Sequence, residues 1–114
     1  MAKGSPTQRS LALLRERGYL VAVVERWNPH AKIRQDLFGC LDLVALGEGQ
    51  TLGVQTTSGG NGNVAERIRK IHSSEAYPRL QAAGWQLIVH GWRKRKGRWI
   101  CREVILGSAT SESA

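Results

Sequence analysis

Apolar residues along this 114-residue chain fall into short runs, and the spacing within each run predicts the element that it forms. The first segment, Ser5–Arg17, carries its leucines on one helical stripe. Ser5 can cap this segment, Pro6 suits the first helical position, and Gly18 supplies a C-terminal stop. We therefore expect the chain to begin with an amphipathic helix.

Runs rich in β-branched and aromatic residues follow, and they predict strands. The expected strands are Tyr19–Trp27, two strands within Gly39–Gly60, Trp85–Trp92 and Arg98–Leu106. Two more helices are expected at Val64–Ile71 and Glu75–Ala83, and the segments 28–36 and 58–63 are expected to be a polar link and a glycine-rich loop. This order predicts one α/β domain over residues 1–106, with a mixed central sheet flanked by helices and a flexible tail at 107–114.

Polar residues interrupt the two strands within Gly39–Gly60. If Gly47–Gln50 is a four-residue loop, Leu46 faces Thr51, and the same register sets Asp42 opposite Gln55. Side chains alternate between the two faces of a strand, so Thr57 shares the face of Gln55. The other, packed face is expected to hold Leu41, Leu43, Leu52 and Val54.

The polar face of this predicted hairpin combines a carboxylate, an amide and a hydroxyl. Carboxylate and amide oxygens are ligands that suit Mg²⁺, which keeps several waters and accepts phosphate oxygens from a substrate. The alternative is that Asp42 forms a local hydrogen bond and the threonines are ordinary strand formers. Spacing alone leaves both interpretations open.

The order of elements, with "GCLDLVAL", a short turn and "LGVQTTS", resembles the PD-(D/E)XK nuclease superfamily, especially its small phage, VRR-NUC-like and Holliday-junction-resolvase-like members. The resemblance in topology covers roughly residues 5–105. It implies a restriction-endonuclease-like αβββαβ core with an acid on the second strand and a (D/E)XK triplet on the third. In that family the two acids bind Mg²⁺ and the lysine helps to activate the attacking water.

Asp42 matches the first acid of that motif, and Gln55, Thr56 and Thr57 match the triplet. Gln55 stands in the place of the second acid and offers an oxygen without a charge, so another carboxylate is expected to help. Asp36 and Glu25 are the best candidates. Glu16 is a weaker one, because it lies in the charged run "RER" of the first helix.

Thr57 stands where the family has its lysine and cannot replace the charge. Lys70 and Arg67 on the following helix, or Lys32 in the link, are candidates to supply it, although the sequence favours a surface or phosphate-contact role for each. The resemblance thus implies a catalytic set of Asp42, Gln55, Thr57, Asp36 and Glu25, with the metal held by Asp42, Gln55 and Asp36.

The charge of the chain favours a polyanionic partner. Seventeen lysines and arginines stand against nine acids, a formal net charge of +8. Five of the cations lie between Trp92 and Trp99, in a turn that can contact a phosphate backbone. We expect the nucleic-acid-binding residues to be Arg67, Lys70, Arg93, Lys94, Arg95, Lys96 and Arg98, and the two tryptophans to be mainly structural.

Other features restrict the protein class. Cys40 and Cys101 lie in apolar runs without a CxxC spacing, so we expect buried thiols in a reducing compartment and no zinc site. The N-terminus lacks a long apolar run and no segment approaches the ~18 apolar residues of a membrane helix, so a cytoplasmic protein is expected. His30, His72 and His90 are expected to be structural or surface groups.

These observations together predict a small Mg²⁺-dependent DNA endonuclease in which Mn²⁺ can substitute. The resemblance implies a structure-specific or junction-resolving enzyme that acts on branched DNA as a homodimer, because resolvases of this type need two active sites. Two alternatives remain open at this stage. One is a nucleic-acid-binding protein of the same fold that no longer cuts, and the other is a basic module that binds RNA or a protein.

Overall fold

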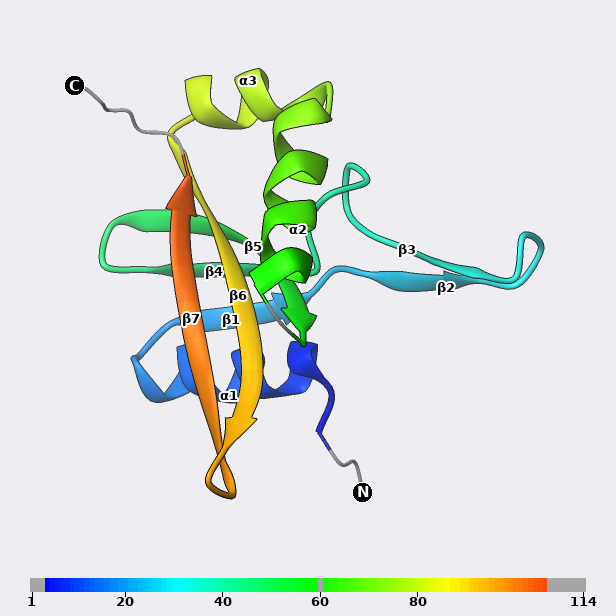
Figure 1. Cartoon of the computed structure of the whole chain (residues 1–114). Helices are drawn as coiled ribbons and strands as arrows, with labels where there is room; N and C mark the ends of the chain where they lie inside the picture. The colour runs from blue at the N-terminus through cyan, green and yellow to red at the C-terminus, as the bar shows by residue number, and fades with distance from the viewer. Residues whose placement is uncertain (1–3, 60, 107–114) are drawn as a thin grey trace.

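The computed structural model describes residues 4–59 and 61–106, which form a mixed sheet with helices on both of its faces (Figure 1). The elements in chain order are α1 (Pro6–Glu16), β1 (Leu20–Val23), β2 (Arg26–Asn28), β3 (Ile33–Gln35), β4 (Leu43–Gly47), β5 (Gln50–Ser58), α2 (Asn61–Ser73), α3 (Ala76–Ala82), β6 (Trp85–Arg95) and β7 (Arg98–Leu106). The predicted tail at 107–114 lies outside the described residues.

The main sheet has the strand order β1-β4-β5-β6-β7. Strands β5 and β6 run parallel, and the other neighbouring pairs are antiparallel. The parallel pair needs a crossover, which α2 and α3 provide. The α/β class and the mixed sheet flanked by helices are therefore confirmed.

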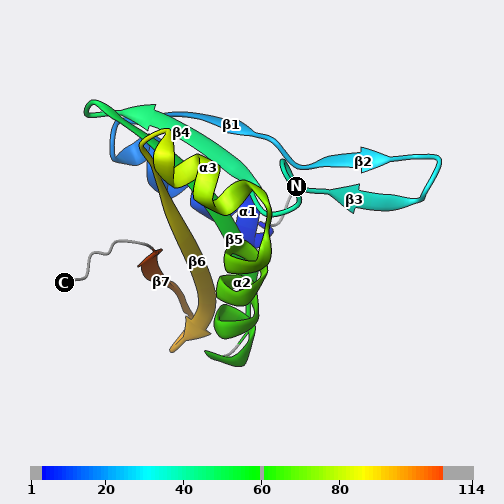
Figure 2. The same cartoon turned by 90° about the horizontal axis from the view of Figure 1, so that it is seen from above.

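Two apolar clusters hold the helices against opposite faces of the sheet (Figures 1 and 2). Leu14 of α1 packs on one face, and Val64 and Ile71 of α2 pack on the other. The face under α1 holds Leu43, Ala45, Leu52, Val54 and Ile88, and the face under α2 and α3 holds Leu41, Leu87 and Val89.

Helix α1 begins as the sequence predicts. The Ser5 hydroxyl oxygen accepts the Gln8 backbone N–H at 3.1 Å, and Pro6 occupies the first turn. Helix α2 begins at Asn61, three residues earlier than predicted. The reason is that the Asn63 side chain does not cap the helix but donates to the Ser58 carbonyl at 2.6 Å, which closes a shorter loop.

A buried polar network joins α1 to the far strands of the sheet. The Ser10 hydroxyl oxygen lies 2.8 Å from Trp92 Nε1, which donates to it, and 2.8 Å from His90 Nδ1. His90 Nε2 lies 2.9 Å from Glu103, whose carboxylate also receives two hydrogen bonds from Arg17. Burial lowers the pKa of His90 despite the neighbouring carboxylate, which favours the neutral ring. His90 and Trp92 are thus structural, as predicted.

The predicted strand Tyr19–Trp27 is wrong in its second half. Strand β1 ends at Val23, and β2 leaves the sheet to pair with β3 in a two-stranded ribbon that projects from the molecule (Figures 1 and 2). We call this ribbon, residues 26–35, the arm. The Asn28 side-chain oxygen accepts the backbone N–H groups of His30 and Ala31, so the segment predicted as a polar link is a hairpin instead.

The β4–β5 hairpin has the predicted register, with Leu46 opposite Thr51. Its turn is shorter than predicted, because Gly47 pairs with Gln50 and only Glu48 and Gly49 remain outside the ladder. Both turn residues have positive φ, 55° and 73°, as a tight two-residue hairpin requires.

The remaining sequence expectations have mixed outcomes. Cys40 is buried, but Cys101 is only partly buried, because its strand β7 lies at the sheet edge; neither forms a disulfide within the described ranges. Across residues 4–59 and 61–106, no helix combines the length and the apolar character that a membrane crossing requires.

Candidate metal centre

Asp42 lies at a bend immediately before β4, where the β4–β5 ladder is disturbed. Leu43 pairs with Val54, and the Asp42 backbone N–H donates to the same Val54 carbonyl at 2.8 Å. Two residues therefore oppose one, which is the arrangement of a β-bulge. Bulges re-aim the side chains beside them, and here Leu41 packs under α2 while Leu43 packs under α1.

This bulge corrects two predictions about the hairpin. Asp42 does not face Gln55 across the ladder; its Oδ2 accepts the Thr56 backbone N–H at 2.8 Å and the Thr56 hydroxyl at 3.0 Å. The Thr56 hydroxyl also lies 3.0 Å from the hydroxyl of Thr7 on α1. Leu41 likewise does not share the packed face of Leu43, because the extra residue reverses the alternation.

Three carboxylates from separate segments meet beside the bulge. One oxygen each of Glu25, Asp36 and Asp42 lies within 4.8 Å of the others. Glu25 precedes β2 and Asp36 follows β3, so the two ends of the arm deliver two of the three acids. They line a pocket of about 360 Å³ that also contains Gln55, Thr57 and Lys70. The structure thus brings together the candidate acids named from the sequence, except for Glu16.

Burial and the closeness of the three carboxylates change the pKa values of Asp42 and Asp36. Burial raises the pKa of Asp42 to about 8, and hydrogen bonding with Glu25 and repulsion from Asp36 act in the same direction. Burial also acts to raise the pKa of Asp36, but hydrogen bonds from Lys70, Asp42 and Gln55 outweigh it and hold that pKa below its ordinary value. Asp42 therefore holds a proton near neutral pH, and Asp36 is ionised.

Gln55 lies at the centre of the pocket with its amide nitrogen facing the acids. Its Nε2 donates to the Cys40 carbonyl at 2.6 Å and to Asp36 Oδ2 at 3.2 Å. Because a carbonyl can only accept, the contact with Cys40 fixes which end of the amide points there. Gln55 thus orients Asp36, and its oxygen points away from this contact.

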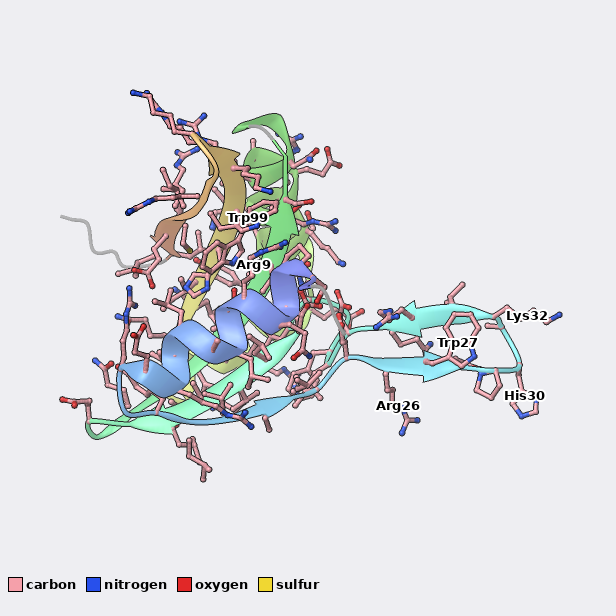
Figure 3. All side chains as sticks on the ribbon, turned by 90° about the horizontal axis from the view of Figure 1, so that it is seen from below. Arg9, Arg26, Trp27, His30, Lys32 and Trp99 are labelled. Atoms are coloured by element: carbon pink, nitrogen blue, oxygen red, sulfur yellow. The ribbon has the colours of Figure 1, made fainter. Side chains whose placement is uncertain are left out.

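A cation enters the pocket from the helix that follows β5. Lys70 Nζ lies 2.7 Å from Asp36 Oδ2, and Arg67, one turn earlier on α2, also lines the pocket. Thr57 lines it too, but its hydroxyl contacts the Ser58 carbonyl at 3.3 Å. Lys32 lies at the far tip of the arm (Figure 3), so of the three cations considered from the sequence only Lys70 and Arg67 reach the pocket.

The sequence does not indicate that Thr56 and Thr7 lie beside Asp42 in the pocket. Alternation without a bulge places Thr56 on the packed face, away from the acids. Thr7 lies far from them in the chain, and only the packing of α1 on the sheet brings it to Thr56. The triplet thus contributes all three of its side chains to the surroundings of the acids.

The predicted basic hairpin is present at the β6–β7 turn. Its five cations, Arg93, Lys94, Arg95, Lys96 and Arg98, are exposed. Trp99 is 42% exposed, and the guanidinium of Arg9 on α1 stacks on its ring at 3.5 Å from the centroid (Figure 3). Trp99 therefore holds a further cation beside this hairpin.

The donor set of the acidic cluster fits a hard divalent cation. Ligands 2.0–2.1 Å from Mg²⁺ stand at most about 4.2 Å apart, close to the spacing that these carboxylate oxygens already have. A bound cation would also favour the ionised form of Asp42, against the burial and the neighbouring charge of Asp36 that raise its pKa. Comparison of the chain with protein-family profiles and with curated proteins finds no match. The fold and the site therefore define an α/β protein with a preformed acidic pocket.

Proposed function

We propose that this chain is a small Mg²⁺-dependent DNA endonuclease of the restriction-endonuclease-like type. One observation carries the proposal: three carboxylates and a lysine converge in a single pocket beside the Gln55–Thr57 triplet. Mn²⁺ is expected to substitute for Mg²⁺, because both accept oxygen ligands.

The topology supports this assignment. Without the arm and β7, the order is α1, β1, β4, β5, α2 and β6, which matches an αβββαβ core when α3 is counted with the crossover. The first three strands are antiparallel neighbours and the last is parallel to the third. The acidic cluster lies where the second and third strands of this core diverge, the place that the resemblance implies.

The residues of the pocket have different roles in the proposed reaction. Glu25, Asp36 and Asp42 would hold the cation, which when bound acts as a Lewis acid and lowers the pKa of a water. Thr56 fixes the Asp42 carboxylate, and Gln55 and Lys70 fix Asp36. Lys70 also places a positive charge in the pocket, where we expect it to help to activate the attacking water, as the family lysine does from the triplet.

The basic surface supports DNA as the substrate. The exposed cations of the β6–β7 hairpin, together with Arg67 on α2, offer contacts to a phosphate backbone. Such contacts give affinity without sequence choice, so we infer recognition of DNA shape, with branched DNA as the substrate. A homodimer acting inside the cell completes the proposal, since paired cuts need two pockets.

One observation favours a second candidate, a DNA-binding protein of the same fold that does not cut. Gln55 is neutral and uses its amide nitrogen toward Asp36, so the triplet itself supplies no charge to a metal. In this alternative the acidic cluster is a structural element, and the basic surface acts alone. An RNA- or protein-binding module is a more distant alternative, supported by charge alone.

The experiment that tests the proposal is cleavage of an end-labelled four-way DNA junction with Mg²⁺ or Mn²⁺. Wild type should cut, and Asp42→Ala and Asp42→Asn should lose this activity. Glu48→Gln is the matched control, because Glu48 lies in the turn at the opposite end of β4. Binding without cutting by wild type would favour the second candidate, and equal cutting by the Asp42 variants would reject the proposed site.

A further inference from the structure

The arm packs little against the rest of the protein. Its two strands have three residues each, and none of residues 26–35 belongs to either apolar cluster of the described chain. Two-stranded ribbons are marginally stable alone in water. Yet this ribbon exposes Trp27 by 56% and Ile33 by 50%. Large exposed apolar side chains on a projecting element indicate a binding surface.

The two faces of the arm differ in their relation to the acidic cluster. Trp27 pairs with Arg34 across the ribbon, so these two side chains share one face. The Arg34 guanidinium lies 3.3 Å from the Glu25 carboxylate, which places that face toward the cluster. Glu25 and Trp27 are two residues apart, about 7 Å along an extended chain. Trp27 therefore lies on the side of the arm that faces the acidic cluster, although it does not itself line the pocket that we propose to be catalytic.

The charge of the arm selects between possible partners. Residues 26–35 contain three cations, Arg26, Lys32 and Arg34, and no acid. Figure 3 shows Lys32 and His30 at the tip and Arg26 on the side away from Trp27. Two arms that met would bring like charges together, so we expect the proposed homodimer to associate through another surface. A polyanion would be attracted to every part of the ribbon.

We propose that the arm is a DNA-reading element, in which Trp27 stacks on a base that has lost its stacking neighbour at a branch point while Arg26, Lys32 and Arg34 contact the flanking phosphates. A base in a continuous duplex is already stacked on its neighbours, so an exposed tryptophan gains most where the stack is broken. Because cluster acids flank both ends of the arm, DNA held on this face of the arm would extend from the branch point to the pocket. This inference rests on the proposed nuclease function and names its substrate feature.

The test is equilibrium binding in EDTA, which prevents metal-dependent cleavage. The probes are a fluorescein-labelled four-way DNA junction and a linear duplex with the sequence of one junction arm. Trp27→Ala should weaken junction binding by about 5-fold to about 150-fold and change duplex binding by less than about 2-fold. Trp27→Phe should retain most of the junction affinity, because a ring remains.

Leu20→Ala is the matched control, since Leu20 on β1 is 73% exposed and lies outside the arm. It should bind both probes as wild type does. Unchanged junction binding by Trp27→Ala would overturn the proposal. So would loss of dimerisation by Trp27→Ala, measured by sedimentation, with junction affinity unchanged, because a second copy would then be the occupant.

The outcomes separate the two proposals. If wild type cuts DNA but Trp27→Ala binds the junction normally, only the role of the arm is wrong. If wild type does not cut but Trp27→Ala selectively loses junction binding, only the nuclease function is wrong.

Discussion

Lys70 of α2 and Asp36 at the end of the arm form an ion pair of 2.7 Å, although they are 34 residues apart in the chain. The lysine is 37% exposed and the aspartate 12%, so the pair opens onto the pocket. A cation thus reaches the acids from the helix that follows β5. In the function that we propose, Lys70 takes the role of the lysine of a (D/E)XK triplet, whose strand position holds Thr57 here.

Replacement of Lys70 should separate metal binding from cleavage. Lys70→Gln removes a positive charge that competes with a cation, so Mn²⁺ should bind as tightly as in wild type or more tightly. Cleavage should nevertheless fall by about 100-fold to 10,000-fold, the range for a positioned group that assists proton transfer or charge stabilisation. Calorimetric titration with Mn²⁺ and junction cleavage measure the two effects.

Arg69→Gln controls for the loss of a helix cation, because Arg69 pairs with Glu66 on the exposed side of α2. It should leave both readouts near wild type. Parallel loss of Mn²⁺ binding and cleavage in Lys70→Gln would show instead that the lysine only holds the pocket together.

Asp42 should make the metal-free protein less stable as the pH rises. Its pKa in the folded chain is raised from 3.8 to about 8, chiefly by burial, so protonation favours the folded state. That stabilisation is complete below the unfolded value of 3.8 and is lost as the pH rises through about 8. Between about pH 5 and pH 8.5 in EDTA, wild type should therefore lose free energy of unfolding relative to Asp42→Asn.

Comparison with the variant matters because His90 has a lowered pKa and titrates with the opposite sign. That contribution is common to both proteins and cancels in the difference. Mg²⁺ added at about pH 8.5 should restore the stability of wild type more than that of Asp42→Asn. A difference between the two proteins that does not change with pH would contradict the raised pKa of Asp42.

The Ser10 hydroxyl should contribute more to the free energy of unfolding than an ordinary buried hydroxyl does. Ser10→Ala leaves the Trp92 indole N–H and the His90 ring nitrogen without their partner between α1 and β6. Each unsatisfied buried group costs about 1–3 kcal/mol, so the loss of a partner for two groups should lower the free energy of unfolding by about 2–6 kcal/mol. Urea denaturation measures this, and a loss below about 0.5 kcal/mol would contradict the network.

Neutralising the β6–β7 hairpin should weaken DNA binding without altering the choice of DNA structure. The variant Arg93→Gln, Lys94→Gln, Arg95→Gln, Lys96→Gln removes exposed cations that are expected to bind phosphate. The slope of log affinity against log salt should become shallower by about 0.9 for each phosphate that is no longer neutralised. Arg79→Gln on α3 shows the effect of removing one cation outside this surface and should change the slope little. An unchanged slope in the hairpin variant would remove this surface from the interface.

The sequence predicts the order of helices and strands in this protein better than it predicts the geometry of the candidate site. Alternation and turn chemistry are sufficient for the β4–β5 register, because these are local properties. The bulge at Asp42 depends on a hydrogen bond to Val54 that no local pattern records. The arm escapes prediction because Asn28–Pro29 resembles the end of a strand, whereas here it closes a hairpin.

The three carboxylates of the cluster show the same contrast between what local sequence indicates and what long-range packing decides. Asp36 is singled out by its proximity to Asp42 in the sequence, and Glu25 by its place near the end of the first predicted strand. Their convergence follows from the arm, which brings its two ends together. Thr7 and Thr56 meet only because α1 packs across β5. Long-range packing thus decides which polar side chains surround Asp42.

The central claim is that Glu25, Asp36 and Asp42 hold the catalytic cation. Its most direct test is the anomalous diffraction of a crystal soaked in Mn²⁺. We expect one strong manganese peak within coordination distance of Asp42 and at least one of the other two carboxylates, and no such peak in Asp42→Asn. Manganese bound elsewhere on the protein, with these three carboxylates left without metal at saturating Mn²⁺, would contradict it.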